Sequence, residues 1–163
     1  MGNDRRLSGP RGVQISFLRT AAETEGALVE FETVAPPRTK GPPLHIHLRE
    51  RESFRVTDGE LAMRAGRHWR LYGVGEAATV EPGTPHTFAN KSDAPAIFVV
   101  RIEPPDPFES MIRIGLASRM MPLLRLAEVH HGDDATLMLA RAPLFAQRMV
   151  WNGLAGIARI VHR

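Results

Sequence analysis

The stretch that decides the fold reads GPPLHIHLRERESFRVTDG at residues 41–59. Two histidines, His45 and His47, are separated within it by the single residue Ile46. In a β-strand, side chains two residues apart point to the same face. The pattern therefore predicts a strand that presents two imidazoles side by side, an arrangement in which both can bind one metal ion.

A carboxylate follows this pair. Glu52 comes five residues after His47, and in a continuous strand that odd spacing would put it on the opposite face. Residues 48–51 must bend or bulge if Glu52 is to join the histidines, and their charges of both signs favour a loop at a barrel rim. Glu50 is the alternative carboxylate, because it lies nearer to His47. Strand parity favours Glu52, which shares a face with the apolar Phe54.

The fourth candidate ligand is His86, which follows the turn Pro82-Gly83-Thr84-Pro85 far along the chain. Such a separation is typical of a ligand from a different strand. The chain has no cysteine, so disulfides, thiolate metal sites and cysteine nucleophiles are excluded. A metal ion must bind to histidine, carboxylate or water, which favours a borderline or hard ion.

Short alternating and apolar runs continue over residues 12–103. They predict strands at 12–19, 26–34, 43–48, 52–57, 60–65, 67–72, 77–81, 86–90 and 95–103. Turn-forming pairs such as Asp58-Gly59 and Pro82-Gly83 separate them. Many short strands at regular spacing predict a mainly β fold, either a barrel or a sandwich.

The pattern changes at Pro104-Pro105-Asp106-Pro107, which a strand cannot easily cross. We therefore expect two parts, a β-barrel domain at residues 1–105 and a C-terminal helical extension at 106–163. Asp106 and Pro107 are typical of a helix start, with Glu109 reaching back to the cap.

Three further helices are expected in the extension. One is predicted over 119–130, a short one from Asp133 or Asp134 to before Pro143, and the last from Pro143 to about His162. The last helix carries an apolar stripe at helical spacing, which predicts packing against the barrel or a partner subunit: Val150, Leu154, Ile157 and Val161.

These residues resemble the two motifs of the cupin superfamily. Residues 41–59 resemble the first motif, with two histidines one residue apart, then a glutamate and a glycine. Residues 81–90, EPGTPHTFAN, resemble the second motif, with a Pro-Gly turn, a histidine and Asn90. The resemblance covers about residues 12–103 and is to small single-domain (cupin-2 type) bacterial barrels, with a looser likeness in the C-terminal extension. It implies a jelly-roll-like double-stranded β-helix with a metal ion on His45, His47, Glu52 and His86, while Asn90 is not assigned to the metal.

Alternation also predicts the surroundings of the metal. Phe54, Met63, Phe88 and Phe98 are expected to line the interior as a substrate pocket. An apolar pocket around a polar centre is the usual form of a small-molecule site. The alternative is a filled barrel core.

Three imidazoles and one carboxylate leave one or two coordination positions open, as catalysis requires. We expect one divalent ion per chain, and Fe, Mn, Ni, Co, Cu and Zn all accept these ligands. The first hypothesis, motivated by a resemblance to quercetinase-like cupins, is a metal-dependent dioxygenase acting on a small apolar or aromatic compound. Glu52 is its candidate catalytic residue, because an apolar pocket is expected to raise the proton affinity of a carboxylate.

Two alternatives come from other classes. In the first alternative, the protein is a non-catalytic small-molecule-binding or sensor cupin, and its helical extension transmits the binding signal or forms a dimer. Otherwise it is a metal-dependent isomerase or epimerase of a sugar-like substrate, which would need more polar groups around the metal than alternation predicts.

Composition restricts the partners. The net charge of +3 comes from basic residues that are scattered along the chain and interleaved with acids, so we expect no nucleic-acid partner. The polar N-terminus is not typical of a signal peptide, and no apolar run approaches the roughly 20 residues that span a bilayer. We therefore expect a cytoplasmic protein without a membrane partner, and a homodimer because cupin barrels commonly pair through their sheets.

Overall fold

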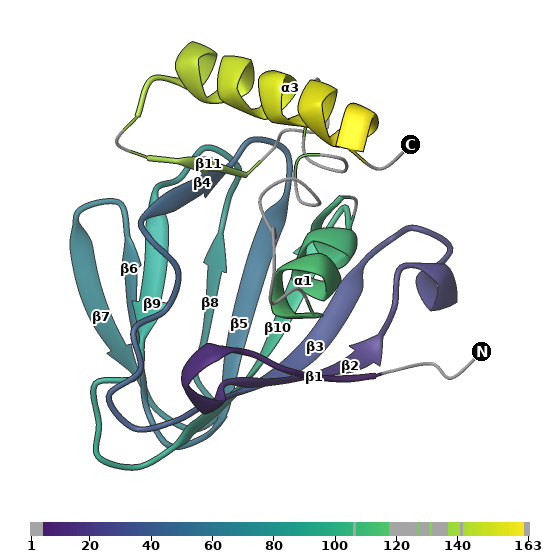
Figure 1. The fold of residues 1–163 in the computed structure, drawn as a ribbon. Helices are drawn as coiled ribbons and strands as arrows, with labels where there is room; N and C mark the ends of the chain where they lie inside the picture. The colour runs from purple at the N-terminus through teal and green to yellow at the C-terminus, as the bar shows by residue number, and fades with distance from the viewer. Residues whose placement is uncertain are drawn as a thin grey trace.

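The computed structural model describes residues 5–105, 107–117, 127, 131, 137–140 and 142–161. Its strands form two antiparallel sheets (Figure 1). The six-stranded sheet has the order β1 (Arg6–Ser8), β2 (Gln14–Arg19), β3 (Val29–Ala35), β10 (Ala96–Glu103), β5 (Arg51–Asp58) and β8 (Ala77–Val80). The five-stranded sheet has the order β11 (Leu137–Leu139), β4 (His45–His47), β9 (His86–Ala89), β6 (Leu61–Ala65) and β7 (His68–Tyr72). Short 3-10 turns lie at Pro10–Gly12 and Ala22–Thr24, and the helices are α1 (Phe108–Ala117) and α3 (Leu144–Val161).

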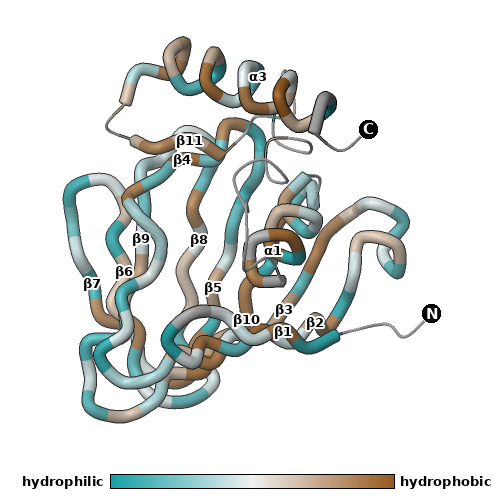
Figure 2. Tube along the Cα trace, viewed as in Figure 1, coloured by the Kyte–Doolittle hydropathy of each residue, from teal (hydrophilic) through white to brown (hydrophobic). Residues whose placement is uncertain are grey.

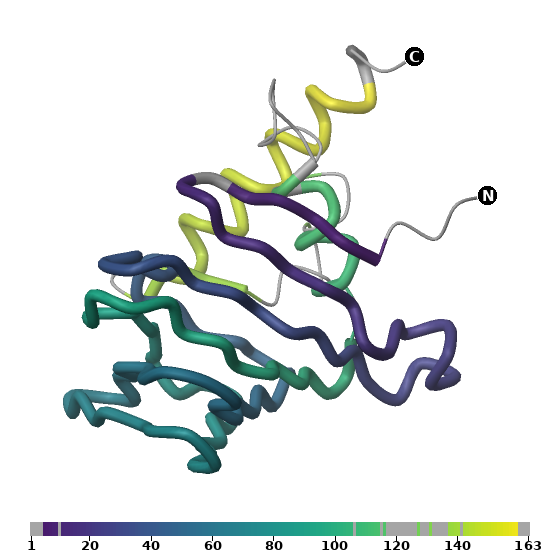
Figure 3. The backbone as a smooth tube through the Cα atoms, turned by 90° about the horizontal axis from the view of Figure 1, so that it is seen from below, coloured from purple at the N-terminus to yellow at the C-terminus, as the bar shows by residue number. Residues whose placement is uncertain are grey.

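The mainly β prediction is confirmed. Strands β2 to β10 correspond one by one to the predicted strands, with ends that differ by a few residues. The sequence did not predict β1, which pairs with β2 through Arg6↔Ser16 to Ser8↔Gln14. Figure 3 shows these N-terminal strands continuing the sheet beside β3 and β10.

The core lies between the two sheets and follows from alternation. Along β5 the side chains of Glu52, Phe54 and Val56 are buried, while Arg51 and Arg55 are exposed. The strand therefore has one face in the interior and one in solvent. In Figure 2 apolar residues recur along β3, β5 and β10. The buried core members include Phe17, Val29, Phe31, Leu61, Met63, Phe98, Val100 and Ile102.

Two glycines bracket the histidine-rich segment, and both are needed for close backbone contacts. The N–H of Gly41 donates to the Phe88 carbonyl oxygen at 3.0 Å, and a Cβ at Gly41 would lie 2.4 Å from that oxygen. Gly59 has a φ of +70° and would place a Cβ 2.4 Å from the Pro95 carbonyl oxygen. A larger residue at either position would move the backbone that positions the segment.

Helix α1 packs on the barrel interior through Phe108 and Ile112. Asp106, the predicted cap, lies outside the described residues. The predicted contact of Glu109 with this cap therefore lies outside the described residues as well, and Glu109 has two other partners. Its carboxylate accepts a hydrogen bond from the Ala21 N–H at 2.7 Å and pairs with Arg113. The first turn of α1 is thereby attached to the loop after β2.

The extension also contributes a strand, which corrects one prediction. The predicted short helix before Pro143 is wrong at residues 137–139, because these form β11 and pair with β4 from Leu137↔His47 to Leu139↔His45. Asp133 and Asp134 lie outside the described residues. So does the predicted helix over 119–130, except Ala127, which is helical and fully buried.

Helix α3 confirms the last predicted helix and lies across β11 and β4 in Figure 1. Ala155 and Ala158 are buried on it. Two members of the predicted apolar stripe, Val150 and Ile157, are 60% and 51% exposed, so the barrel covers less than half of each. Within the described ranges, no helix combines the length and hydrophobicity that crossing a membrane requires.

Candidate metal centre

The four predicted ligands meet at one point, and both sheets supply them. His45 and His47 lie on β4, and His86 lies on the neighbouring β9, where it pairs directly with His45. Glu52 comes from β5 in the opposite sheet. The candidate site therefore depends on how the two sheets are held together.

This arrangement explains the odd spacing between His47 and Glu52. Strand β4 ends at His47 and β5 begins at Arg51, with a bend at residues 48–49. The chain leaves one sheet and enters the other within this segment. The bend that the parity argument required is thus a change of sheet, which lets an odd-spaced side chain face the same interior.

The ligand atoms are close together and shielded from solvent. One nitrogen or oxygen from each of the four residues lies within 4.8 Å of the others. All four residues are buried, with exposed fractions between 1% and 5%: His86, His47, His45 and Glu52. The rings of His45 and His86 have centroids 4.2 Å apart.

Backbone carbonyls orient two of the three imidazoles. His45 Nδ1 lies 2.8 Å from the Pro43 carbonyl oxygen, and His86 Nδ1 lies 2.9 Å from the Thr84 carbonyl oxygen. A carbonyl oxygen only accepts, so each Nδ1 must carry the hydrogen. In the neutral rings Nε2 then keeps its lone pair, as a metal-binding histidine requires.

The contacts at Nε2 fit a cation. His86 Nε2 lies 2.8 Å from a Glu52 carboxylate oxygen, and His47 Nε2 lies 3.4 Å from the same oxygen. A neutral Nε2 and a carboxylate both accept, so they need a shared proton or a metal ion between them. His47 Nε2 is buried without a hydrogen-bond partner in the described part of the chain. The donor set suits a first-row divalent ion.

In the metal-free site, the pKa values of three candidate ligands are shifted by burial and by their charged neighbours. Burial, with help from the charge of His86, lowers the pKa of His45 to about 4. Burial also lowers the pKa of His47, but the carboxylates of Glu50 and Glu52 outweigh it and raise that pKa to about 9. Burial raises the pKa of Glu52, while contacts with His47 and His86 lower it to about 2. The expected rise in the proton affinity of Glu52 is therefore not found, because its imidazole neighbours dominate.

Glu50, the alternative carboxylate, is buried behind the site. It is 1% exposed, and its carboxylate lies 3.7 Å from His47 Nδ1, on the side of the ring away from Glu52. It is outside the group of four ligand residues. Sequence parity separated the two glutamates, but it gave no signal that Glu50 would be buried.

Asn90, the last residue of the second motif, holds a loop. Its Nδ2 lies 3.0 Å from the carbonyl oxygens of Ala35 and Pro36 and 2.7 Å from that of Ala94. Its Oδ1 accepts from the Ser92 N–H at 3.0 Å. The amide thus joins the end of β3 to the turn before β10.

A cavity of about 650 Å³ opens onto the ligands. His45 and Glu52 form part of its wall, and the rest is almost entirely apolar: Val13, Ile15, Phe31, Thr33, Pro42, Pro43, Phe88, Val100, Phe108, Met111, Ile112, Leu116 and Leu137. Of the predicted pocket residues, Phe88 lines this cavity. Phe54, Met63 and Phe98 lie in the buried core, where the rings of Phe54 and Phe98 contact Phe88.

The helical extension completes this cavity, which alternation in the barrel could not foresee. Phe108, Met111, Ile112 and Leu116 come from α1, and Leu137 comes from β11. The Phe108 ring also packs on His47, with centroids 5.1 Å apart. The extension therefore contacts both a candidate ligand and the space beside it.

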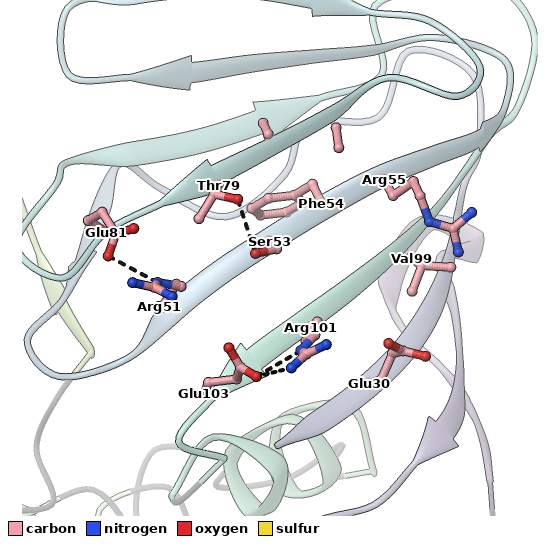
Figure 4. A pocket seen from close by; sticks show the side chains of 12 residues that line it. Glu30, Arg51, Ser53, Phe54, Arg55, Thr79, Glu81, Val99, Arg101 and Glu103 are labelled. Carbon is pink, nitrogen blue, oxygen red and sulfur yellow. Dashed lines mark hydrogen bonds and ion pairs between the residues drawn. The ribbon is translucent and has the colours of Figure 1, made fainter. Parts of the chain in front are cut away.

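A second hollow, of about 590 Å³, lies on the outer face of the six-stranded sheet. Figure 4 shows Arg51, Ser53 and Arg55 along β5, with Arg51 paired to Glu81 and Arg101 to Glu103. Charges of both signs pair there, as on a solvated surface. This face is the reverse of the one that carries Glu52.

Comparison with known protein families matches part of the chain. The family model for a cupin domain, Cupin_2, matches residues 31–102, the region that contains all four candidate ligands. Residues 31–102 of the chain therefore contain a cupin domain. No curated protein matches it.

Two solved structures with TM-scores above 0.5 agree with this fold. A predicted oxalate decarboxylase from Thermotoga maritima is 22% identical, with a TM-score of 0.53 over 60% of this chain and 89% of that chain. KdgF from Halomonas sp. is 17% identical, with a TM-score of 0.53 over 61% of this chain and 84% of that chain. A sugar phosphate isomerase of the cupin superfamily from Silicibacter pomeroyi is 26% identical, with a TM-score of 0.48, and the match spans 55% of this chain and 59% of that one.

Proposed function

We propose that this cupin binds a small, largely apolar or aromatic molecule against a divalent metal ion held by His45, His47, Glu52 and His86. The observation that carries the proposal is the cavity wall. Two candidate ligands, His45 and Glu52, share it with apolar side chains. Such a site favours a ligand with an apolar body and an oxygen donor at one end.

A metal ion bound there would supply a Lewis acid and open coordination positions for an oxygen atom of the ligand. The chain would supply the rest of the site. The α1 side chains Phe108 and Met111 exclude water from the metal side of the cavity. The Pro43 and Thr84 carbonyls fix the orientation of the His45 and His86 rings.

In its enzymatic form we propose a dioxygenase of the quercetinase-like kind, with dioxygen as the oxidant. Support comes from the apolar cavity, which suits a phenol-like substrate better than a sugar. Glu52 is the proposed catalytic residue. Its lowered pKa keeps Glu52 ionised near neutral pH. Its place in the cavity wall would put the carboxylate beside a bound hydroxyl group, whose proton it would accept.

The competing proposals are a non-catalytic binding or sensor protein and a sugar isomerase or epimerase. The first shares the same cavity and differs only in turnover. A sugar isomerase or epimerase needs several polar side chains to bind the hydroxyl groups of its substrate. Among the described residues that line this cavity, Thr33 alone carries a hydroxyl group.

The test uses full-length protein loaded separately with Fe²⁺, Mn²⁺, Co²⁺, Ni²⁺, Cu²⁺ and Zn²⁺. Binding of flavonols and simple phenols is measured by fluorescence quenching, and oxygen consumption is measured with an electrode. Metal-dependent binding with oxygen uptake supports the dioxygenase, and binding without uptake supports the binding protein. Loss of both in the presence of bound metal, with phosphosugars raising the melting temperature instead, would overturn the proposal.

A further inference from the structure

Glu50 is a buried carboxylate that lies outside the group of four candidate ligands. Its side chain is fully buried, and the Arg49 N–H donates to it at 3.3 Å. Burying a carboxylate is costly unless it is paired. The His47 imidazole lies beside this carboxylate, with Nδ1 3.7 Å from a Glu50 oxygen.

The three histidines differ at their outer nitrogens. His45 and His86 each face a carbonyl oxygen two residues earlier, at Pro43 and Thr84. For His47 the residue two positions earlier is His45, which is paired with both β9 and β11. In the described residues, His47 Nδ1 has no hydrogen-bond partner. The Glu50 carboxylate, 3.7 Å away, lies where the other two rings have a backbone oxygen.

We infer that Glu50 is a positioning residue, whose carboxylate holds the Nδ1–H of His47 so that Nε2 faces Glu52 and the other two imidazoles. This inference rests on the metal site of the proposed function. A carboxylate behind a histidine fixes the ring tautomer and makes the imidazole a stronger electron donor than a carbonyl does. His47 is then the strongest of the three nitrogen donors.

The position of Glu50 also links the site to the change of sheet. Glu50 is the last residue before β5, between His47 on one sheet and Glu52 on the other. Its contact with His47 spans three residues, and Arg49 between them is exposed. The turn therefore presents one carboxylate to each side of the same imidazole.

The first test measures Co²⁺ affinity of the full chain by competition with a chromogenic chelator. Glu50→Gln keeps the shape and removes the charge, and we expect Co²⁺ affinity to fall about 10- to 100-fold. Glu50→Asp, which keeps the charge, should lose less. The matched control is Glu81→Gln, an exposed carboxylate beside the same strand, and it should bind as the parent does.

Two further readouts separate positioning from a purely structural role. The visible absorption bands of bound Co²⁺ should shift in Glu50→Gln, because the donor strength of His47 changes. In the unmodified Zn²⁺-loaded protein, long-range ¹H–¹⁵N spectra should show His47 protonated at Nδ1 and metal-bound at Nε2, as for His45 and His86. This second measurement needs no variant to fold.

Each outcome decides the inference. Metal binding through His47 Nδ1, or Glu50→Gln protein with unchanged affinity and unchanged Co²⁺ spectrum, would overturn it. Loss of affinity as complete as that of Glu52→Gln would also overturn it, since Glu50 would then be a ligand. If the unmodified protein binds none of these ions, the proposed function itself fails, a result distinct from an altered Glu50 variant.

Discussion

Glu52 and His86 are in direct contact, with a carboxylate oxygen 2.8 Å from the imidazole Nε2, although they belong to different sheets and are separated by 34 residues in the chain. The His86 Nδ1 is already engaged by the Thr84 carbonyl. The contact therefore joins two sheets through a pair of atoms that both suit a metal ion. The first prediction addresses this pair.

Glu52→Gln and His86→Ala should each reduce metal affinity at least about 100-fold, because each removes a donor atom. Titration calorimetry with Zn²⁺ measures the change. Glu81→Gln serves again as the control, since Glu81 is exposed and paired with Arg51 on the outer face. Unchanged affinity in either ligand variant would remove that residue from the site.

Metal binding should release a proton from His47. The pKa of this ring is raised from 6.5 to about 9 in the metal-free protein, so the ring is protonated at pH 7.5. A metal ion needs the neutral ring, so binding should displace about one proton and tighten as pH rises toward 9. Calorimetry in buffers with different ionisation enthalpies counts the protons. A count of zero between pH 7 and 8 would contradict the pairing of His47 with the carboxylates of Glu50 and Glu52.

The cavity can be filled from α1 without touching the ligands. Met111→Trp should weaken binding of a flavonol probe at least about tenfold, since the larger ring occupies the space beside the metal. Metal affinity should change little. The matched control is Met149→Trp, because Met149 is 71% exposed on α3. Equal probe affinity in the two variants would show that the ligand does not occupy this cavity.

Gln147 on α3 holds the free edge of β11. Its Oε1 accepts from the Leu139 N–H at 2.7 Å, and its Nε2 donates to the carbonyls of Leu139 and Ala142 at 3.0 and 2.8 Å. Gln147→Ala should destabilise β11 locally by about 1–2 kcal/mol, which corresponds to roughly 5- to 30-fold faster exchange of the Leu139 amide. Hydrogen exchange read by mass spectrometry tests this, with Arg148→Ala on the exposed side as control. Equal exchange in both variants would contradict the assigned role.

The barrel could be predicted because its residues follow a local rule. Alternation along β5 gave the buried Glu52 and Phe54 directly, and the same parity indicated the bend before them. Strand β1 was missed because Arg-Leu-Ser at residues 6–8 is too short and polar to alternate visibly. Strand β11 was missed because Leu-Met-Leu at 137–139 has no polar residue to break a helical interpretation, so its partner β4 decides its structure.

The candidate ligands could be predicted from the sequence, but their surroundings could not. Spacing and the resemblance to the cupin motifs indicated His45, His47 and His86, whereas the apolar wall depends on which distant segments pack over the barrel. Met111 and Leu137 reach the cavity only through tertiary contacts of the extension. The buried position of Glu50 likewise depends on the turn between sheets, whose side-chain directions no strand period determines.

The pairing of β11 with β4 also covers a strand edge at which two copies of the protein could otherwise associate. Without Leu137–Leu139, the strand that carries His45 and His47 would have an open edge, with unpaired N–H and C=O groups next to the metal ligands. Open edges recruit strands from other molecules. By pairing with β4, the C-terminal extension therefore disfavours aggregation through this edge, where an added strand would disturb the candidate metal ligands.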